Sequence, residues 1–130
     1  MKQGRFSHKR EAILETIRST KTHPSAEWIY NKLKIKYKDL SLGTIYRNIA
    51  LFKEQGLITS VENVGGHERL DGNTVPHAHF ICLNCNEVID IDSSLINTDF
   101  NNQLSEKYDF NIDYQKIIFY GKCSKCLKER

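Results

Sequence analysis

The stretch SLGTIYRNIALFKEQGLITSVENVGGHERL, residues 41–70, has the pattern of a helix followed by a β-hairpin. Ser41 is a typical N-cap, and Gly56 follows the expected last turn, where glycine often ends a helix. The buried face of this helix is expected at Ile45, Ile49 and Phe52. Short β signals at residues 57–61 and 68–70 flank residues 63–66, whose composition is typical of a turn.

Two further helices are predicted upstream of this stretch. Residues 10–20 place Ile13, Leu14 and Ile17 at helical spacing, with Ser7 as the expected cap. His23-Pro24-Ser25 interrupts the pattern, and residues 26–36 resume it, with Ser25 or Thr22 as the cap. The buried side of this second helix is expected to hold Trp28, Ile29, Leu33 and Tyr37. Three helices followed by a hairpin is the element order of a winged helix-turn-helix domain.

The second half of the chain predicts a small α+β lobe. Residues 71–76 contain Gly, Asn and Pro and are typical of a linker. Strands are predicted at residues 79–83, 88–91 and 111–120, and a helix is predicted at residues 94–108. A lobe this small would gain stability from a bound metal and from dimerisation. The sequence therefore predicts an α+β fold with a winged-helix domain at 1–71, a hinge at 72–76 and a second domain at 77–130.

Charge is divided unevenly along the 130 residues. The net charge is +3, but residues 1–70 carry thirteen basic against seven acidic residues, whereas residues 71–130 carry six against nine. A basic first half favours contact with a polyanion such as nucleic acid, although an uneven solvated surface would look the same. No apolar run approaches the roughly 20 residues that span a bilayer, and residues 1–10 lack a signal-peptide pattern. We expect a cytoplasmic protein with no membrane partner.

Four cysteines form two pairs, Cys82-x-x-Cys85 and Cys123-x-x-Cys126, with 37 residues between them. A two-residue gap lets both sulfurs of a pair reach one ion, and four thiolates close the tetrahedral shell of zinc. Such a closed site holds structure and performs no chemistry. The alternatives are a redox dithiol or two disulfides, which are less common in a reducing compartment.

A second group of possible ligands combines imidazoles and carboxylates. His77 and His79 lie two apart, so on a strand they would face the same way. Asp90 lies on the next predicted strand, Asp71 follows the hairpin, and His23 precedes the second helix. Mixed nitrogen and oxygen ligands suit Fe²⁺, Mn²⁺ or exchangeable zinc, although each residue alone is more often simply solvated. His8 and His67 have no comparable setting and are expected to be surface residues.

Four segments resemble the ferric uptake regulator family. They are His23-Pro24-Ser25-Ala26, Ser41-Leu42-Gly43-Thr44-Ile45-Tyr46-Arg47-Asn48, His77-Ala78-His79-Phe80-Ile81-Cys82 and Tyr120-Gly121-Lys122-Cys123-Ser124-Lys125-Cys126. They occur in the family's order and cover nearly the whole chain. The resemblance implies a winged-helix DNA-binding domain, a hinge, a domain that forms a homodimer, and a structural Zn²⁺ on the four cysteines.

The resemblance also implies a regulatory Fe²⁺ or Mn²⁺ site. Its ligands would be His23, Asp71, His77, His79 and Asp90. Aspartate at position 90 is similar to the peroxide-sensing branch of the family, whereas iron-sensing members usually have glutamate there. Gln115 stands where iron sensors often have a histidine. Zinc sensors typically have a cysteine near the His-x-His segment, and here there is none besides those of the two Cys-x-x-Cys pairs.

A metal held by both domains would fix one domain against the other, so that the two DNA-binding domains of the dimer lie at the spacing of two half-sites on operator DNA. Resemblance to the peroxide-sensing branch implies that Fe(II) catalyses the oxidation of a ligand histidine, here His23 or His77, which would remove a ligand and release the DNA. This reaction has no turnover, so we expect a transcriptional repressor and not an enzyme, with peroxide as its only small-molecule substrate. The expected DNA contacts are thymine methyls for Tyr46, base edges or phosphate for Arg47, and phosphate for Ser41 and Thr44. The resemblance also implies that Arg5 contacts the minor groove.

Three other functions compete with this prediction. Within the family, an iron-responsive repressor of metal-uptake genes would respond to the level of Fe(II) and not to peroxide. A metallohydrolase would use the His and Asp ligands to activate water, but the sequence has no HExxH motif and no nucleophile with a positioned base. A plain zinc-ribbon interaction module would bind DNA equally well with and without a second metal.

Overall fold

The computed structural model describes residues 8–96 and 100–129. The chain divides into two compact units, Met1–Val75 and Pro76–Arg130, called unit 1 and unit 2 below. Three helices and a hairpin make up the described part of unit 1, and a three-stranded sheet with two α-helices that of unit 2. No helix within the described ranges is long and apolar enough to cross a membrane.

Unit 1 begins with α1 (His8–Ser19), α2 (Ala26–Leu33) and α3 (Leu42–Glu54). The hydroxyl oxygen of Ser25 accepts a hydrogen bond from the Trp28 amide, and that of Ser41 accepts one from the Thr44 amide, each at 3.1 Å. These bonds satisfy amides that have no partner within the helix, and they fix where α2 and α3 begin. The predicted caps at Ser25 and Ser41 are confirmed, whereas the cap expected at Ser7 lies outside the described residues.

The hairpin of unit 1 pairs β1 (Thr59–Val64) with β2 (His67–Asp71) in antiparallel register. Gly65 and Gly66 alone make the turn, with φ values of 61° and 86°. Both angles lie in the left-handed region that favours glycine, as two-residue hairpin turns require. The first strand therefore runs later than the predicted residues 57–61, and the turn is shorter than the predicted residues 63–66.

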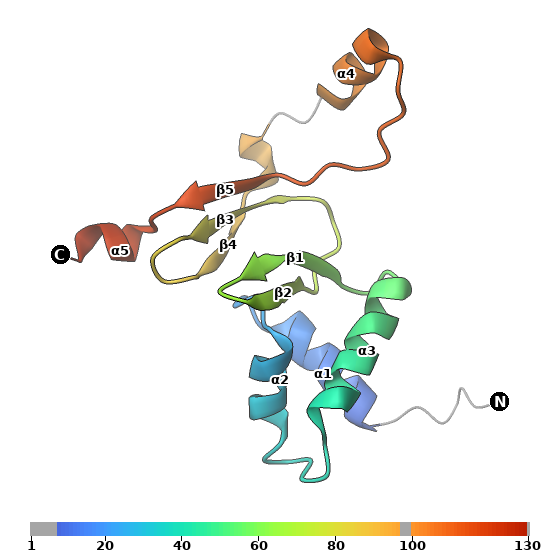
Figure 1. Ribbon diagram of the computed structural model, residues 1–130, viewed down its shortest axis with the longest axis vertical. Helices are drawn as coiled ribbons and strands as arrows, with labels where there is room; N and C mark the ends of the chain where they lie inside the picture. The colour runs from blue at the N-terminus through green and yellow to red at the C-terminus, as the bar shows by residue number, and fades with distance from the viewer. Residues whose placement is uncertain (1–7, 97–99, 130) are drawn as a thin grey trace. The chain divides into compact units, whose positions relative to one another are not determined.

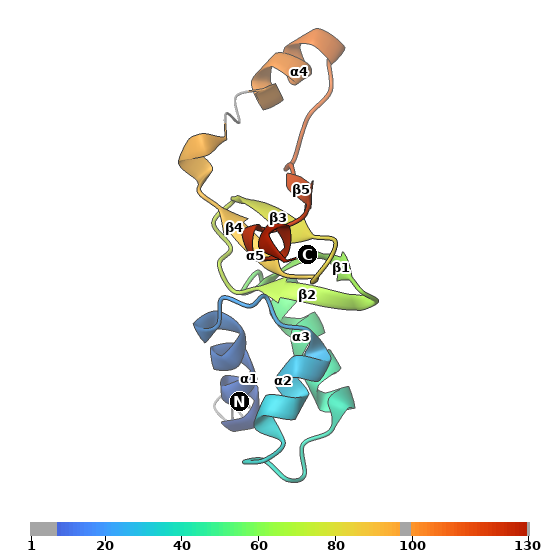
Figure 2. The same cartoon turned by 90° about the vertical axis from the view of Figure 1, so that its left-hand side faces the viewer.

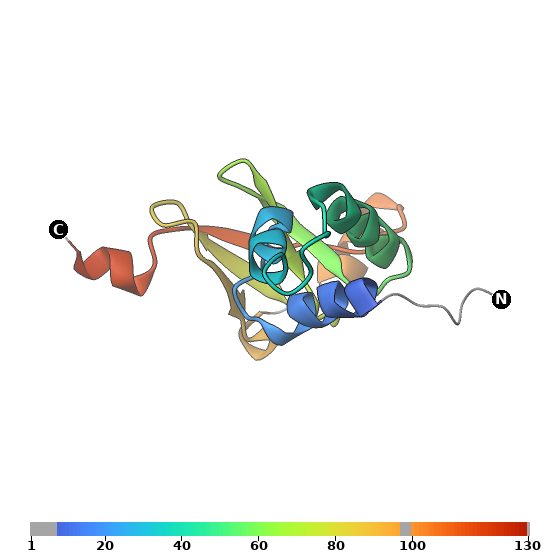
Figure 3. The same cartoon turned by 90° about the horizontal axis from the view of Figure 1, so that it is seen from below.

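The core of unit 1 lies between the three helices and the base of the hairpin (Figures 1 and 3). Its largest fully buried side chains are Ile13, Ile17, Ile29, Ile45, Phe52, Ile58 and Leu70. The apolar spacing predicted for α1 and α3 is confirmed. Trp28 departs from the prediction, because it is 37% exposed and packs under the Lys32 ammonium instead of entering the core. The second helix also ends at Leu33 and not at Lys36, because the Leu33 carbonyl closes a turn with the amides of Lys36 and Tyr37.

Unit 2 is built on the sheet order β4–β3–β5 (Figure 2). The strand β3 (Ala78–Cys82) runs antiparallel to β4 (Val88–Ile91) and parallel to β5 (Ile118–Gly121). A 3₁₀ turn, η2 (Ser93–Leu95), and α4 (Phe100–Tyr108) come between β4 and β5, and α5 (Ser124–Lys128) follows β5. The α+β class and the winged-helix order predicted from the sequence are confirmed.

Two predicted elements of unit 2 have different bounds in the structure. Of the helix expected over 94–108, Phe100–Tyr108 is helical, residues 97–99 lie outside the described residues, and Ser93–Leu95 form a separate 3₁₀ turn that Asp92 caps. The strand expected over 111–120 is wrong over residues 111–117, because pairing starts only where Ile118 meets His79 of β3. The short helix α5 was not predicted.

Candidate functional site

The four cysteine sulfurs of unit 2 converge on one point. Cys82 ends β3, Cys85 lies in the turn that follows, Cys123 follows β5, and Cys126 lies in α5. The Cys82 and Cys126 sulfurs are 3.7 Å apart, those of Cys85 and Cys123 are 3.8 Å apart, and all four lie within 4.8 Å of one another. A tetrahedron with zinc–sulfur bonds of roughly 2.3 Å has sulfur–sulfur edges of about 3.8 Å. The four thiols therefore fit a tetrahedral ion, and none of them forms a disulfide.

The sequence brings the two pairs together through the parallel register of β3 and β5. Cys82 pairs with Gly121, so the chain that leaves β5 delivers Cys123 to the end of β3. A Cβ atom at position 121 would lie 3.3 Å from the Phe80 ring, so this position of β5 favours glycine. The left-handed Asn86, with φ of 65°, turns the chain from Cys85 into β4.

The thiols of the cluster titrate differently. Burial acts to raise the pKa of Cys82, but the amides of Cys123, Cys85 and Asn84 point at its sulfur and lower the pKa to about 6. The Glu87 amide acts to lower the pKa of Cys85, but burial and the neighbouring thiols raise it to about 12. Cys82 therefore loses its proton far more readily than Cys85 does.

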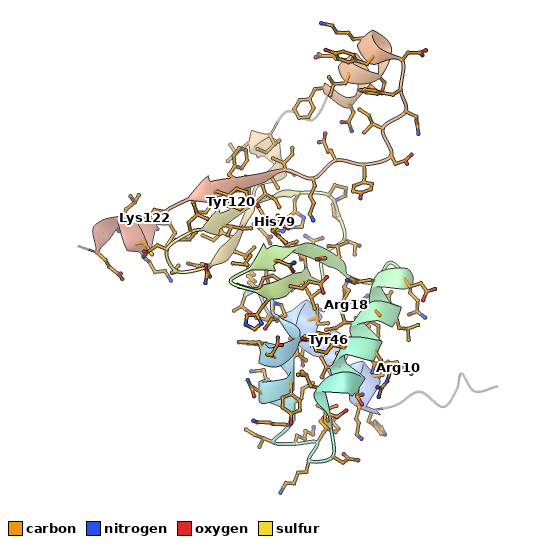
Figure 4. The ribbon with its side chains drawn as sticks, in the orientation of Figure 1. Arg10, Arg18, Tyr46, His79, Tyr120 and Lys122 are labelled. Carbon is orange, nitrogen blue, oxygen red and sulfur yellow. The ribbon has the colours of Figure 1, made fainter. Side chains whose placement is uncertain are left out.

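Unit 2 also brings His77, His79 and Asp90 together. His79 of β3 is directly opposite Asp90 of β4 in the antiparallel register (His79 is labelled in Figure 4). Asp90 Oδ1 lies 3.0 Å from His77 Nε2 and 3.2 Å from His79 Nε2, and the two rings are 4.4 Å apart. His79 is buried, whereas the Asp90 side chain is 45% exposed. Two imidazole nitrogens and a carboxylate on one spot are a donor set for Fe²⁺ or Mn²⁺.

Unit 1 brings His23 and Asp71 together. His23 Nε2 lies 3.5 Å from Asp71 Oδ2, and both residues are buried, at 4% and 6% exposed. His23 has a φ of 56°, in the left-handed region, and Asp71 ends β2. The Asn73 amide donates to Asp71 Oδ1 at 2.8 Å, which leaves the second oxygen facing the imidazole. Each unit thus holds one part of the donor set predicted from the sequence.

The exposed face of α3 carries the residues expected to contact DNA. Tyr46 is 47% exposed, as its position off the apolar stripe predicts, and Arg47 is exposed beside it. Arg47 donates to the Thr44 hydroxyl at 3.1 Å, and that hydroxyl lies 3.0 Å from the Ser41 hydroxyl. The fifth expected contact, Arg5, lies outside the described residues.

Sequence reasoning missed the partners of Tyr46. Its hydroxyl donates to Glu27 Oε2 at 2.8 Å, and the other Glu27 oxygen lies 3.2 Å from His67 Nδ1 (Tyr46 is labelled in Figure 4). The Tyr46 hydroxyl lowers the pKa of Glu27, and the Glu27 carboxylate raises the pKa of Tyr46. His67, expected to be a plain surface residue, is therefore linked through Glu27 to α3. Nothing in the local pattern indicates this contact, because α2, α3 and β2 each supply one residue.

The family model described as the ferric uptake regulator family matches residues 2–120. The peroxide-responsive repressor PerR of Staphylococcus aureus (strain USA300) is 31% identical over 122 residues, which cover 94% of this chain and 82% of that protein. The solved ferric uptake regulator of Vibrio cholerae is 30% identical with a TM-score of 0.74, over 91% of each chain. The ferric uptake regulator of Pseudomonas aeruginosa, solved with manganese, is 25% identical with a TM-score of 0.72, over 92% of this chain and 90% of that one.

Proposed function

The chain belongs to the ferric uptake regulator family, and from that premise we propose that it is a metal-dependent DNA-binding repressor that senses hydrogen peroxide. The proposed cofactors are a structural Zn²⁺ on Cys82, Cys85, Cys123 and Cys126, and a regulatory Fe²⁺ or Mn²⁺. The regulatory ligands are His23, Asp71, His77, His79 and Asp90. The protein works as a homodimer on double-stranded operator DNA.

The observation that carries this proposal is the division of the nitrogen and oxygen donors between the two units. His23 and Asp71 belong to unit 1, whereas His77, His79 and Asp90 belong to unit 2. An ion bound by all five residues couples the DNA-binding unit to the other unit. Metal therefore raises DNA affinity to the extent that the DNA-bound arrangement binds metal more tightly. A zinc ion on the cysteines alone would lie within unit 2 and could not have this effect.

Dimerisation through unit 2 is supported by its uncovered apolar side chains. No described residue of α4 is buried, although this helix carries Phe100, Leu104 and Tyr108 on its apolar positions. Leu95 is 77% exposed and Tyr114 is 81% exposed, and the β5 residues Phe119 and Tyr120 are about half exposed. So many large apolar groups on a small lobe are typical of a protein interface. A second copy of the chain is the occupant that the family implies.

DNA binding is supported by the basic first half of the chain and by α3. Ser41, Thr44, Tyr46 and Arg47 lie along the exposed side of α3 near its N-terminus. A helix of this kind in a winged-helix unit enters the major groove, where tyrosine can contact thymine methyls and arginine can reach base edges or phosphate. Arg5 is proposed to reach the minor groove.

Peroxide sensing consumes a histidine ligand. When bound, Fe²⁺ supplies the redox chemistry that activates hydrogen peroxide. In the net reaction, one peroxide oxygen is added to an imidazole carbon of His23 or His77 and the other leaves as water, so peroxide is reduced by the two electrons that the ring loses. The oxidised ring is a poorer ligand, and the link between the units is lost. The 31% identity to a peroxide-responsive repressor supports this assignment.

Peptide mass spectrometry tests the peroxide proposal. The zinc-loaded protein is given Fe(II) or Mn(II), exposed to low peroxide under limited oxygen, and digested. We expect the mass of one oxygen atom on a peptide that holds His23 or His77, in the iron form only. An iron-loaded protein with no added oxygen on either peptide would contradict peroxide sensing.

An iron-responsive repressor of metal-uptake genes is the second candidate. It is favoured by the 30% identity to the ferric uptake regulator of Vibrio cholerae. Such a repressor would bind DNA when Fe(II) is abundant and release it when Fe(II) is removed. Its ligand histidines would keep their mass after peroxide.

A further inference from the structure

Arg69 of β2 holds the loop that presents His23. Its guanidinium donates through Nη2 to the Thr22 carbonyl at 2.7 Å and through Nε to the His23 carbonyl. The neighbouring Leu70 amide donates to the Pro24 carbonyl at 2.9 Å. Three consecutive carbonyls of the α1–α2 loop are therefore held by two consecutive residues of β2. We call the two guanidinium bonds, from Arg69 to Thr22 and His23, the Arg69 clamp.

The loop needs such a clamp because its backbone is not in a relaxed form. His23 has a φ of 56° and precedes Pro24. A residue before proline is pushed towards extended or polyproline conformations, and a left-handed non-glycine residue persists only when its surroundings enforce it. Without the clamp, the peptide at His23 would relax towards the extended region and carry the imidazole with it.

The same strand supplies the carboxylate that faces this imidazole. Arg69 and Asp71 are two residues apart on β2, so they lie on the same face of the strand. Asp71 Oδ2 lies 3.5 Å from His23 Nε2, and both side chains are buried. Strand β2 therefore fixes the imidazole through Arg69 and the carboxylate through Asp71, which sets their separation.

Arginine suits this role better than lysine. The two acceptors are carbonyls of adjacent residues, and the planar guanidinium offers N–H groups in a rigid fork, whereas an ammonium is a single point charge. Arg69 is half-buried, and burial lowers its pKa from the ordinary value. Hydrogen bonds from a partly desolvated cation are stronger than those in open water.

We propose that Arg69 is a positioning residue for the His23–Asp71 pair: its fork on the carbonyls of Thr22 and His23 holds the imidazole in place for a metal ion. This inference rests on the proposed function, because His23 and Asp71 act there as ligands of the regulatory ion. Arg69 itself does not touch the ion.

Manganese affinity tests the role of the clamp. Arg69→Lys keeps the charge and removes the fork. Arg18→Lys is the matched control, because Arg18 is exposed on α1 (Arg18 is labelled in Figure 4). Free Mn(II) is followed by electron paramagnetic resonance in the zinc-loaded protein. We expect Arg69→Lys to weaken Mn(II) binding by about tenfold or more, the usual loss for a residue that orients a ligand, and Arg18→Lys to leave it unchanged. An unchanged affinity of Arg69→Lys would overturn the proposal.

A double-mutant cycle with His23→Ala separates positioning from general damage. If Arg69 acts through His23, its replacement should cost less than about twofold in affinity once the imidazole is gone. An equal loss with and without the imidazole would show that Arg69 acts by another route, and would overturn the proposal.

Hydrogen exchange in the metal-free protein tests the clamp without any ion. We expect the Leu70 amide, which bonds to Pro24, to exchange several times faster in Arg69→Lys and at the wild-type rate in Arg18→Lys. Unchanged exchange, or faster exchange spread evenly over unit 1, would overturn the proposal. If the wild-type protein bound no Mn(II), the regulatory site itself would fail, and this experiment would still judge whether Arg69 holds the loop.

Discussion

One oxygen atom of Asp90 faces two imidazoles. Asp90 Oδ1 lies 3.0 Å from His77 Nε2 and 3.2 Å from His79 Nε2, and the side chain is only half covered. The short aspartate side chain, on a strand paired directly with β3, fixes this position closely. The geometry of the proposed regulatory site should therefore be sensitive to the length of the acidic side chain at position 90.

Asp90→Glu is expected to blunt the response to peroxide. The added methylene moves the carboxylate relative to both rings, so the ligand geometry changes while its charge is kept. We expect the rate of histidine oxidation in the iron-loaded protein to fall by about tenfold or more, the scale seen when ligand geometry is disturbed. The rate is measured by peptide mass spectrometry over a time course of peroxide exposure.

Mn(II) affinity of the same variant is the control. A variant that no longer binds metal would say nothing about the rate of histidine oxidation. Asp90→Ala serves as the reference for such a loss of metal binding. If Asp90→Glu bound Mn(II) and was oxidised at the wild-type rate, the length of the acid at position 90 would not govern the response to peroxide, and this prediction would be wrong.

At the scale of single elements, α2 and α3 have equivalent caps with different surroundings. Ser25 and Ser41 each accept an amide bond at 3.1 Å from the residue three positions on. Ser41 also lies 3.0 Å from the Thr44 hydroxyl, at the end of α3 that is proposed to approach phosphate. Replacing each serine in turn therefore distinguishes the effect of a lost helix cap from the effect of a lost contact with DNA.

Ser25→Ala and Ser41→Ala should each lower the free energy of unfolding by about 1 kcal/mol, the typical loss of an N-cap. Chemical denaturation of unit 1 measures this loss. Only Ser41→Ala should also weaken DNA binding, because only its hydroxyl is proposed to contact phosphate. Equal DNA affinity of the two variants would remove Ser41 from the proposed interface.

A helix or strand could be predicted from the sequence when the interactions that define it lie within a few residues of one another. The helices of unit 1 could be predicted because Ser25, Ser41 and the apolar spacing act within a few residues. The limits of β5 could not, because Ile118 starts the strand only by pairing with His79, 39 positions earlier in the chain. The Arg69 clamp and the Glu27–Tyr46 bond join elements far apart in sequence, so no local pattern indicates them.

The sequence predicted which residues could bind metal, but not how these residues are arranged in space. The spacing of the cysteines indicated one closed ion site, and the sulfurs converge as expected. The His-x-His pair indicated a shared face, and the register with Asp90 completes it. The pairing of His23 with Asp71 came only from the family resemblance, because 48 positions separate them and the left-handed backbone at His23 leaves no trace in residue type.

At the scale of the whole molecule, the two units differ in what stabilises them. Unit 1 has a continuous core of isoleucine, leucine and phenylalanine side chains. The buried apolar residues of unit 2 are few, and three of its four cysteines are among them. A lobe of this kind depends on its metal for folding. Zinc binding and the folding of unit 2 are therefore coupled.

Zinc affinity should rise with pH. Zinc binds thiolates, and above pH 6 Cys82 is already deprotonated, whereas the raised pKa of Cys85 (to about 12) and of Cys126 means that both still carry protons. At least two protons must therefore leave on binding, so affinity should increase by at least about 100-fold per pH unit between pH 6.5 and 7.5. Competition with a chelator of known pH dependence measures this slope. An affinity independent of pH would contradict a site of four thiolates.

The most direct test of the central claim is DNA binding by the zinc-loaded protein, titrated with Mn(II) and Fe(II) before and after low peroxide. Fluorescence anisotropy of an operator-like duplex at fixed salt gives the affinity. We predict that either metal strengthens binding, and that peroxide abolishes the gain in the iron form while the manganese form keeps it. Binding that is the same with and without the second metal would contradict a metal-dependent repressor.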